Sequence, residues 1–417
     1  MIKEYLSIVK NREFMYLWIS QVLSQLTVNF ITFLLLLRLF ERTGSSFATS
    51  LIWVSYALPA IIVGPVASAF VDMHDRRKIM MFANFAQFSI ILFFSFFYDY
   101  YLYFSYFVVI IYSLFNQFYL PSEAASLQFL VPKDKLPHAN ALFFMTQQIG
   151  LILGFGLAGI FSEFLGFSRT IFLASLFLLL AFVSVSFLPP MKLSKEESGN
   201  IEEKIFIFIK EILEGYYFLK VKKKVLAALA FLIILQVCLA VVTTNLPVIA
   251  RQLLMVKPNH ASLYAVIPAG LGAFVGALTI PRVVNKKIRK KVIIRSALLL
   301  LTVSLWLIVL LVPMLTFYFR TFVAVVLFFL AGISFLANMI LAQTYIQENT
   351  PKTLMGRVFG IFWFLTTVAT VIPVLFSATI TDLLGVGTVL TTLGFISLGV
   401  YGISLLYERK IKFFRYV

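Results

Sequence analysis

Apolar residues recur along this chain in twelve long runs, which short polar or charged segments separate. Each run holds about 20 or more mainly apolar residues, the length that an α-helix needs to cross the hydrocarbon core of a bilayer. The pattern predicts an all-α polytopic membrane protein with twelve transmembrane helices. The expected spans are 14–40, 47–71, 79–98, 101–120, 139–162, 168–188, 226–250, 261–281, 292–313, 317–345, 355–381 and 386–407.

Composition supports the bilayer as the solvent of this chain. Hydrophobic residues make up 61% of it and charged residues only 13%, whereas an ordinary soluble domain is about 25% charged. The net charge of +17 would suit nucleic-acid binding if the basic residues shared a solvated face. They instead fall in short groups between the apolar runs, so we expect no nucleic-acid partner.

The distribution of Lys and Arg predicts the orientation in the membrane. Of the 35 basic residues, 29 lie at the termini and in or within a few residues of the even-numbered connections, and 6 lie in or within a few residues of the odd-numbered connections. Cytoplasmic segments carry the excess of Lys and Arg. We therefore expect a multi-pass protein of the cell (inner or plasma) membrane with both termini in the cytoplasm.

The longest connection divides the twelve spans into six and six. We expect an amino-terminal bundle at 1–188, a cytoplasmic linker at 189–225 with an amphipathic helix along the membrane surface, and a carboxy-terminal bundle at 226–417. The halves also repeat without a gap at a shift of 219 residues, which pairs Pro132 with Pro351, Lys133 with Lys352, Glu163 with Asp382 and Gly166 with Gly385. Such a duplication predicts a substrate path between the halves near the bilayer midplane.

One charged segment interrupts the apolar pattern with an unusual density of ionic residues. The stretch "GPVASAFVDMHDRRKIM", from Gly64, resembles the signature loop between spans two and three of the major facilitator superfamily. "PSEAASLQFLVPKDKLPHANAL" from Pro121 and "PKTLMGRVFGIFW" from Pro351 resemble the branch with macrolide-efflux and siderophore-export carriers. The resemblance implies two pseudo-symmetric six-helix bundles, alternating access and export of amphipathic small molecules in exchange for protons.

The same resemblance implies a gate at the cytoplasmic side. Asp72 would lie at the end of span two, where the exposed amides at the start of span eleven would stabilise a carboxylate. Arg76 could pair with an acid of a neighbouring span, for which Glu123 is a better candidate than Glu163. The alternative is that the basic residues of the loop only set topology. The expected gate residues are Asp72, Arg76, Arg77, Glu123 and Arg357.

A transport path needs polar side chains in an apolar wall, because a polar group that faces lipid is costly. On the first span, four polar residues follow one another at spacings of four, four and three, so they share one helix face. Similar residues occur on spans four, five, seven and ten. Interhelical hydrogen bonding is the alternative role for each of them. The expected lining residues are Gln21, Gln25, Asn29, Thr32, Asn116, Gln147, Gln236 and Asn338.

Span five contains the glycine-rich stretch "GLILGFGLAGIF". Gly150, Gly154 and Ala158 form a small-residue face that permits close helix packing. Gly154 and Gly159 also resemble an exporter motif of the superfamily, although Phe155 stands where that motif has proline.

The driving force is less evident from the sequence. All 18 acidic residues fall in connections or near span ends, and Glu123 is the one acid with a claim to a partly buried position. Proton coupling is therefore implied by kinship. No phosphate-binding loop or metal-ligand spacing occurs, and we expect no enzyme activity, no cofactor and no metal. We expect a monomer that acts on an amphipathic small molecule. A lipid or lysolipid carrier of the same fold and a transport-inactive membrane sensor or assembly factor stay open as alternatives.

Overall fold

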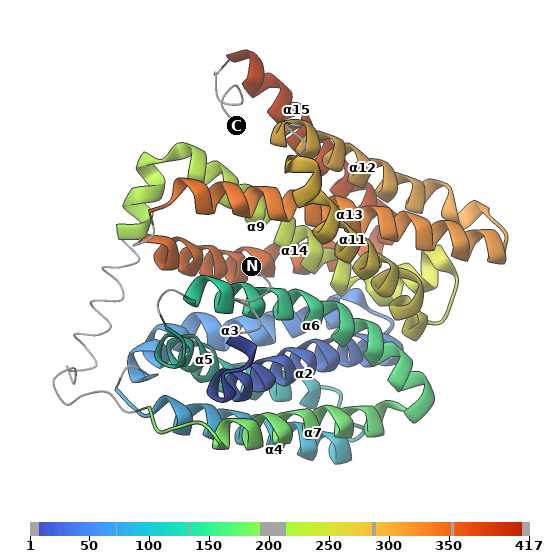
Figure 1. Cartoon of the computed structure of the whole chain (residues 1–417). Helices are drawn as coiled ribbons and strands as arrows, with labels where there is room; N and C mark the ends of the chain where they lie inside the picture. The colour runs from blue at the N-terminus through green and yellow to red at the C-terminus, as the bar shows by residue number, and fades with distance from the viewer. Residues whose placement is uncertain are drawn as a thin grey trace. The chain divides into compact units, whose positions relative to one another are not determined.

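The computed structural model describes residues 8–71, 73–132, 135–191, 214–285, 289–351 and 354–410. Over these residues the regular elements are helices, and twelve of them are long and apolar enough to cross a membrane. The prediction of an all-α polytopic fold with twelve spans is therefore confirmed. The described residues form two compact units, Met1–Arg38 with Leu51–Leu213 and Leu39–Ser50 with Glu214–Val417 (Figure 1).

The first unit holds most of six long helices, which are blue to green in Figure 1, while the end of α2 and the start of α3 belong to the second unit. Within it, α4 packs along both α5 and α7. Phe14, Leu17, Met80 and Tyr119 are almost completely buried in one apolar cluster. Close packing of such side chains stabilises the unit through van der Waals contacts. The helices are α2 (Arg12–Thr43), α3 (Ser46–Val71), α4 (Arg76–Phe97), α5 (Phe104–Leu130), α6 (Leu136–Leu165) and α7 (Phe167–Ser186).

Glycines let α6 approach α2 closely in the first unit. A Cβ atom on Gly154 would lie 2.5 Å from the Cβ of Asn29, and one on Gly150 would lie 3.1 Å from the Cβ of Gln25. Real Cβ atoms do not come as near as 2.5 Å without a shift of the neighbour. The small-residue face of α6 thus contacts the helix that carries the polar stripe.

The second unit contains the remaining spans. Its helices α11 and α13 are in very close contact, because a Cβ on Gly272 or on Gly332 would each lie 1.9 Å from a backbone oxygen of the other helix. The long helices are α9 (Lys223–Thr244), α11 (Ile267–Asn285), α12 (Lys290–Leu310), α13 (Phe317–Asn349), α14 (Met355–Leu384) and α15 (Val386–Lys410), and between α9 and α11 lie α10 (Leu246–Ile249) and shorter helical turns.

The two units share a backbone feature at positions that the sequence repeat pairs. Gly166 ends α6 with φ 80° and ψ 165°, and Gly385 ends α14 with φ 84° and ψ 157°. A positive φ of this size favours glycine over any residue with a side chain. Each glycine therefore allows a one-residue turn between two consecutive spans, α6 to α7 and α14 to α15.

Candidate functional site

The helix α5 continues well beyond the predicted end of the fourth span at residue 120. It runs to Leu130 and contains Pro121, which removes one backbone donor without ending the helix. Glu123 therefore lies inside a membrane-spanning helix, with 6% of its surface exposed. The sequence places Glu123 near the end of span four, and the structure places it inside α5 and buries it, because the polar stretch "SEAAS" continues the helix.

A chain of hydrogen bonds surrounds Glu123 in the first unit. The Tyr119 hydroxyl, one helical turn earlier, donates to Glu123 Oε1 at 3.2 Å. Ser20 Oγ of α2 lies 2.9 Å from the Tyr119 hydroxyl, and Asn84 Nδ2 of α4 donates to Ser20 Oγ at 3.2 Å. Ser24 of α2 completes the group by donating to Asn84 Oδ1 at 3.4 Å. Three helices thus join in one buried polar cluster, whose members are at most 6% exposed.

Arg76 contacts α5 through the backbone. Its Nη1 donates to the carbonyl oxygen of Ala125 at 3.3 Å. Among the described residues it forms no ion pair with Glu123, so the predicted Arg76–Glu123 pair is absent from this structure. The carbonyl of Ala125 accepts from Nη1 of Arg76, whose Nε is buried without a hydrogen-bond partner in the described part of the chain, and the carboxyl group of Glu123 is turned toward Tyr119.

Asp75 has a structural role that the sequence analysis did not assign. It is the N-cap of α4, and its carboxylate accepts hydrogen bonds from the backbone amides of Arg77 at 3.1 Å and Met191 at 3.2 Å. Arg77 in turn donates to the carbonyl of Ser186 at the end of α7. An Asp that directly precedes a helical run is a recognised N-cap signal, so the role of Asp75 could have been inferred from position alone. Asp72 lies outside the described residues.

Arg357, the remaining gate candidate, lies near the start of α14 in the second unit. It forms an ion pair with Glu214, and both side chains are partly exposed. Gly215 packs beside it, because a Cβ there would lie 3.3 Å from the Cβ of Arg357 and 2.7 Å from Cδ1 of Ile361. Leu219 is buried in a cluster with Val358 and Ile361. The segment before α9, helical over residues 214–221, is therefore docked on the start of α14.

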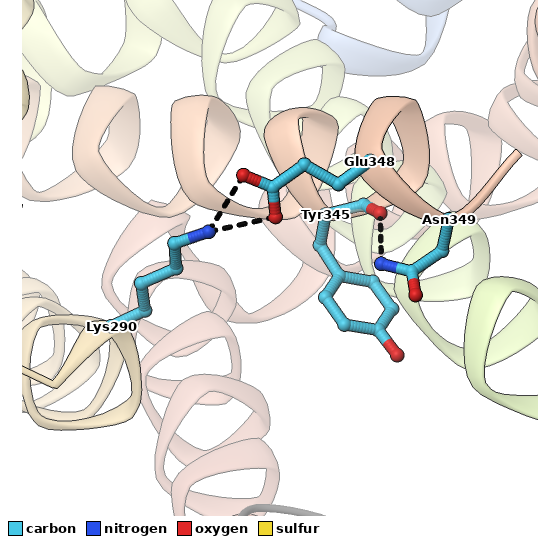
Figure 2. A network of polar contacts seen from close by, with 4 residues as sticks. All are labelled: Lys290, Tyr345, Glu348 and Asn349. Carbon is cyan, nitrogen blue, oxygen red and sulfur yellow. Dashed lines mark hydrogen bonds and ion pairs between the residues drawn. The ribbon is translucent and has the colours of Figure 1, made fainter. Parts of the chain in front are cut away.

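A second ion pair ties the ends of two helices together in this unit. Figure 2 shows the Lys290 ammonium group between the two carboxylate oxygens of Glu348, at 2.9 and 2.8 Å. On the same helix, Asn349 Nδ2 donates to the carbonyl of Tyr345 at 2.8 Å. Because Glu348 is half exposed, this pair contributes at most about 1 kcal/mol.

The polar stripe of α2 divides into two parts. Gln21 is 3% exposed and donates to the carbonyl of Phe143 on α6 at 3.1 Å, so it serves helix association. Gln25, Asn29 and Thr32 are half buried. The side chains of Asn29 and Thr32 donate to carbonyls of their own helix, at 2.7 and 2.6 Å, and form no hydrogen bond to another helix of the described residues, although the Cβ of Asn29 packs against Gly154 of α6.

The other lining candidates also differ in their surroundings. Asn116 donates to the Tyr56 hydroxyl of α3 at 2.8 Å, which is an interhelical bond. Asn338 is fully buried and donates to the carbonyl of Ser334 on its own helix at 2.9 Å, which leaves its Oδ1 without a partner. Gln147 and Gln236 are half buried. Of the packing glycines, Gly150 and Gly154 contact α2, and Gly159 is buried.

Known proteins similar to this chain were found by sequence, and others were found by similarity of fold. Macrolide efflux protein A of Streptococcus pyogenes is 24% identical over 377 residues, which cover 90% of each chain. An uncharacterized MFS-type transporter of Bacillus subtilis, YfiS, is 24% identical over 388 residues, 92% of this chain and 90% of its own.

Among solved structures, a POT family transporter in complex with a thioalcohol conjugated peptide matches with a TM-score of 0.70 at 15% identity, over 98% of this chain and 99% of its own. The nucleoside transporter NupG matches with a TM-score of 0.69 at 13% identity, over 94% and 99%. These two matches show the fold alone. The sequence profile described as Major Facilitator Superfamily extends over residues 17–374. With its twelve spanning helices, the chain thus belongs to the Major Facilitator Superfamily of membrane transporters.

Proposed function

We propose that this transporter exports amphipathic small molecules by alternating access and that the proton gradient drives the export. The observation that carries the proposal is the polar face of α2. Gln25, Asn29 and Thr32 are half buried in an otherwise apolar helix, and the hydrogen bonds of Asn29 and Thr32 stay within that helix. A polar side chain that serves helix association bonds to another helix, so these side chains are better suited to a substrate path.

The chemistry of this face favours an amphipathic ligand. Its amide and hydroxyl groups are uncharged, and the chain contains 46 Phe residues. Such a surface offers hydrogen bonds and apolar contact together, as small-molecule sites commonly do. The similarity to macrolide efflux protein A over 90% of both chains supports export as the direction.

The proposal includes an orientation and a gate. The excess of Lys and Arg in the even-numbered connections supports cytoplasmic termini in the cell membrane. Asp72, Arg76, Arg77, Glu123 and Arg357 would form the cytoplasmic gate of a monomeric carrier. The contacts of Arg76 with α5 and of Arg77 with α7 are consistent with a loop that holds helix ends together.

Transport by everted membrane vesicles tests the function. Vesicles with the wild-type protein should accumulate radiolabelled erythromycin or ethidium when the interior is acidic, and an ionophore that collapses the pH gradient should abolish the accumulation. Thr32→Ala removes a hydroxyl from the polar face and should weaken the apparent substrate affinity. Thr392→Ala is the matched control, because Thr392 is exposed on α15 and also donates to the carbonyl four residues earlier. Vesicles that accumulate neither probe would argue against a drug exporter, and uptake of a fluorescent lysolipid instead would favour a lipid carrier.

A further inference from the structure

We propose that Glu123 is the proton-binding site that couples this transporter to the proton gradient, and that Tyr119, Ser20 and Asn84 form a hydrogen-bonded relay to it. The inference rests on the proposed proton-driven export and assigns a residue to it. Within the described part of the chain, Glu123 is an acidic residue inside a spanning helix, and only 6% of its surface is exposed. An ionisable residue at such a place is expensive to maintain and usually functional.

The surroundings of the carboxyl group leave its charge uncompensated. The basic side chain of Arg76 contacts α5, but its guanidinium donates to the Ala125 carbonyl and, within the described residues, forms no ion pair with Glu123. The one donor on the carboxyl group is the neutral hydroxyl of Tyr119. A buried carboxylate that lacks a cationic partner is costly to hold ionised. Binding of a proton removes this cost, so occupancy by a proton alters the energy of this conformation.

The hydrogen-bond chain can serve both protonation states. When Glu123 is ionised, Tyr119 donates to it, Ser20 donates to Tyr119, and Asn84 donates to Ser20. When Glu123 is protonated, its hydroxyl can donate to Tyr119, and the Tyr119 hydroxyl can turn to Ser20. Either oxygen can be the donor in the Ser20–Tyr119 contact. The Glu123–Tyr119–Ser20 part of the chain can therefore reverse its direction without movement of the helices, while Asn84 Nδ2 remains a donor to Ser20 in both states.

The groups around the site come from each neighbouring helix. On α5 the titratable neighbour is Tyr119, and α4 contributes the uncharged Asn84 and the charged Arg76. From α2 come the uncharged Ser20 and Ser24. On α3, Tyr56 is bonded to Asn116, two turns before Glu123. Glu123 lies seven residues before the end of α5 at Leu130, about 10 Å along the helix. A proton can therefore reach it from one membrane surface over a short path.

Infrared difference spectroscopy of the protein in lipid vesicles tests the site without any substrate. As the pH is raised from mildly acidic to mildly alkaline, the wild type should lose the carbonyl band of a protonated buried carboxylic acid. The band should return when the pH is lowered. Glu123→Gln should abolish this band. Glu13→Gln should keep it, because Glu13 is exposed at the start of α2. A titrating band that survives in Glu123→Gln, or a wild type without one, would overturn the assignment.

Tyr119→Phe supplies a second measurement in case Glu123→Gln does not reach the membrane. It keeps the aromatic ring and removes only the hydroxyl that donates to the carboxylate. Because that hydroxyl bonds to the carboxyl group, its loss should shift the midpoint of the band. An unchanged midpoint would show that the relay does not act on Glu123.

Transport separates a failure of this inference from a failure of the proposed function. For one-for-one exchange, a gradient of one pH unit supports about a tenfold substrate gradient. Glu123→Gln should lose this accumulation of erythromycin. If accumulation by the wild type does not depend on the pH gradient, the proposed proton coupling is wrong. If wild type and Glu123→Gln are coupled alike, only the role of Glu123 is wrong.

Discussion

The carboxylate of Asp382, near the end of α14, accepts a hydrogen bond of 2.7 Å from the hydroxyl of Ser45, which directly precedes α3. It also accepts the backbone amides of Ser46 at 2.7 Å and Phe47 at 3.0 Å. The residues are more than 330 positions apart in sequence, and both belong to the second unit through the connection Leu39–Ser50. One carboxylate thus satisfies amides that the start of α3 cannot bond within the helix.

Asp382→Asn should loosen this connection. An amide has a single acceptor oxygen and no charge to interact with the helix dipole, so at least one of the three bonds is lost. The expected loss is about 1 kcal/mol or less, because Asp382 is exposed and screened by solvent. Hydrogen–deuterium exchange should become faster over residues 45–50. Glu163→Gln, at the exposed equivalent position of the repeat, should leave that segment unchanged. Equal exchange in Asp382→Asn and wild type would contradict the capping role.

The glycines of α6 and α14 allow a matched comparison. Gly154→Ala should destabilise the protein by about 1–3 kcal/mol, because its Cβ would lie 2.5 Å from that of Asn29. Gly360→Ala has open space around the added carbon, and alanine is the better helix former, so this variant should be neutral or slightly stabilised. Thermal unfolding in detergent measures both. A Gly154→Ala variant as stable as Gly360→Ala would show that α2 and α6 are less closely packed.

Topology can be measured with reporter fusions. Fusions after Lys195 and Arg289 should be active as cytoplasmic reporters, and a fusion after Gly44 should be active as an external reporter. The physical reason is the retention of Lys- and Arg-rich connections on the cytoplasmic side. The three sites lie in different connections, so a single inverted result would identify the part of the chain at which the twelve-span topology is wrong.

Much of the fold followed from periodicity and length, and most of the site did not. The twelve apolar runs determine twelve helices because each must satisfy its own backbone in the bilayer. The pairing of Gly166 with Gly385 was visible in the sequence repeat, and the structure shows a turn at each of them. The end of α5 was missed because Pro121 and the polar residues after it interrupt the apolar run, whereas in the structure the helix continues and buries Ser122, Glu123 and Ser126.

Contacts between helices needed the structure. The spacing of Tyr119 and Glu123 places them one turn apart, so their hydrogen bond could have been proposed from sequence. Nothing in the sequence shows that Ser20 and Asn84 extend this bond onto two further helices. Nor could the partner of Arg76 be chosen, since a backbone carbonyl such as that of Ala125 is present at every position.

Cysteine labelling tests the polar face of α2 directly. In a Cys238→Ala background, which removes the single native thiol, cysteines at Gln25 and Asn29 should react with a water-soluble, membrane-impermeant thiol reagent. Cysteines at Leu34 and Leu36 are the controls, because both side chains are fully buried on the same helix. A thiol reacts as the thiolate, which forms only where water reaches it. Substrate should slow the reaction at Gln25 and Asn29 if they line the path. Protection of all four positions, with or without substrate, would mean that the polar face of α2 is packed and that the path runs along other helices.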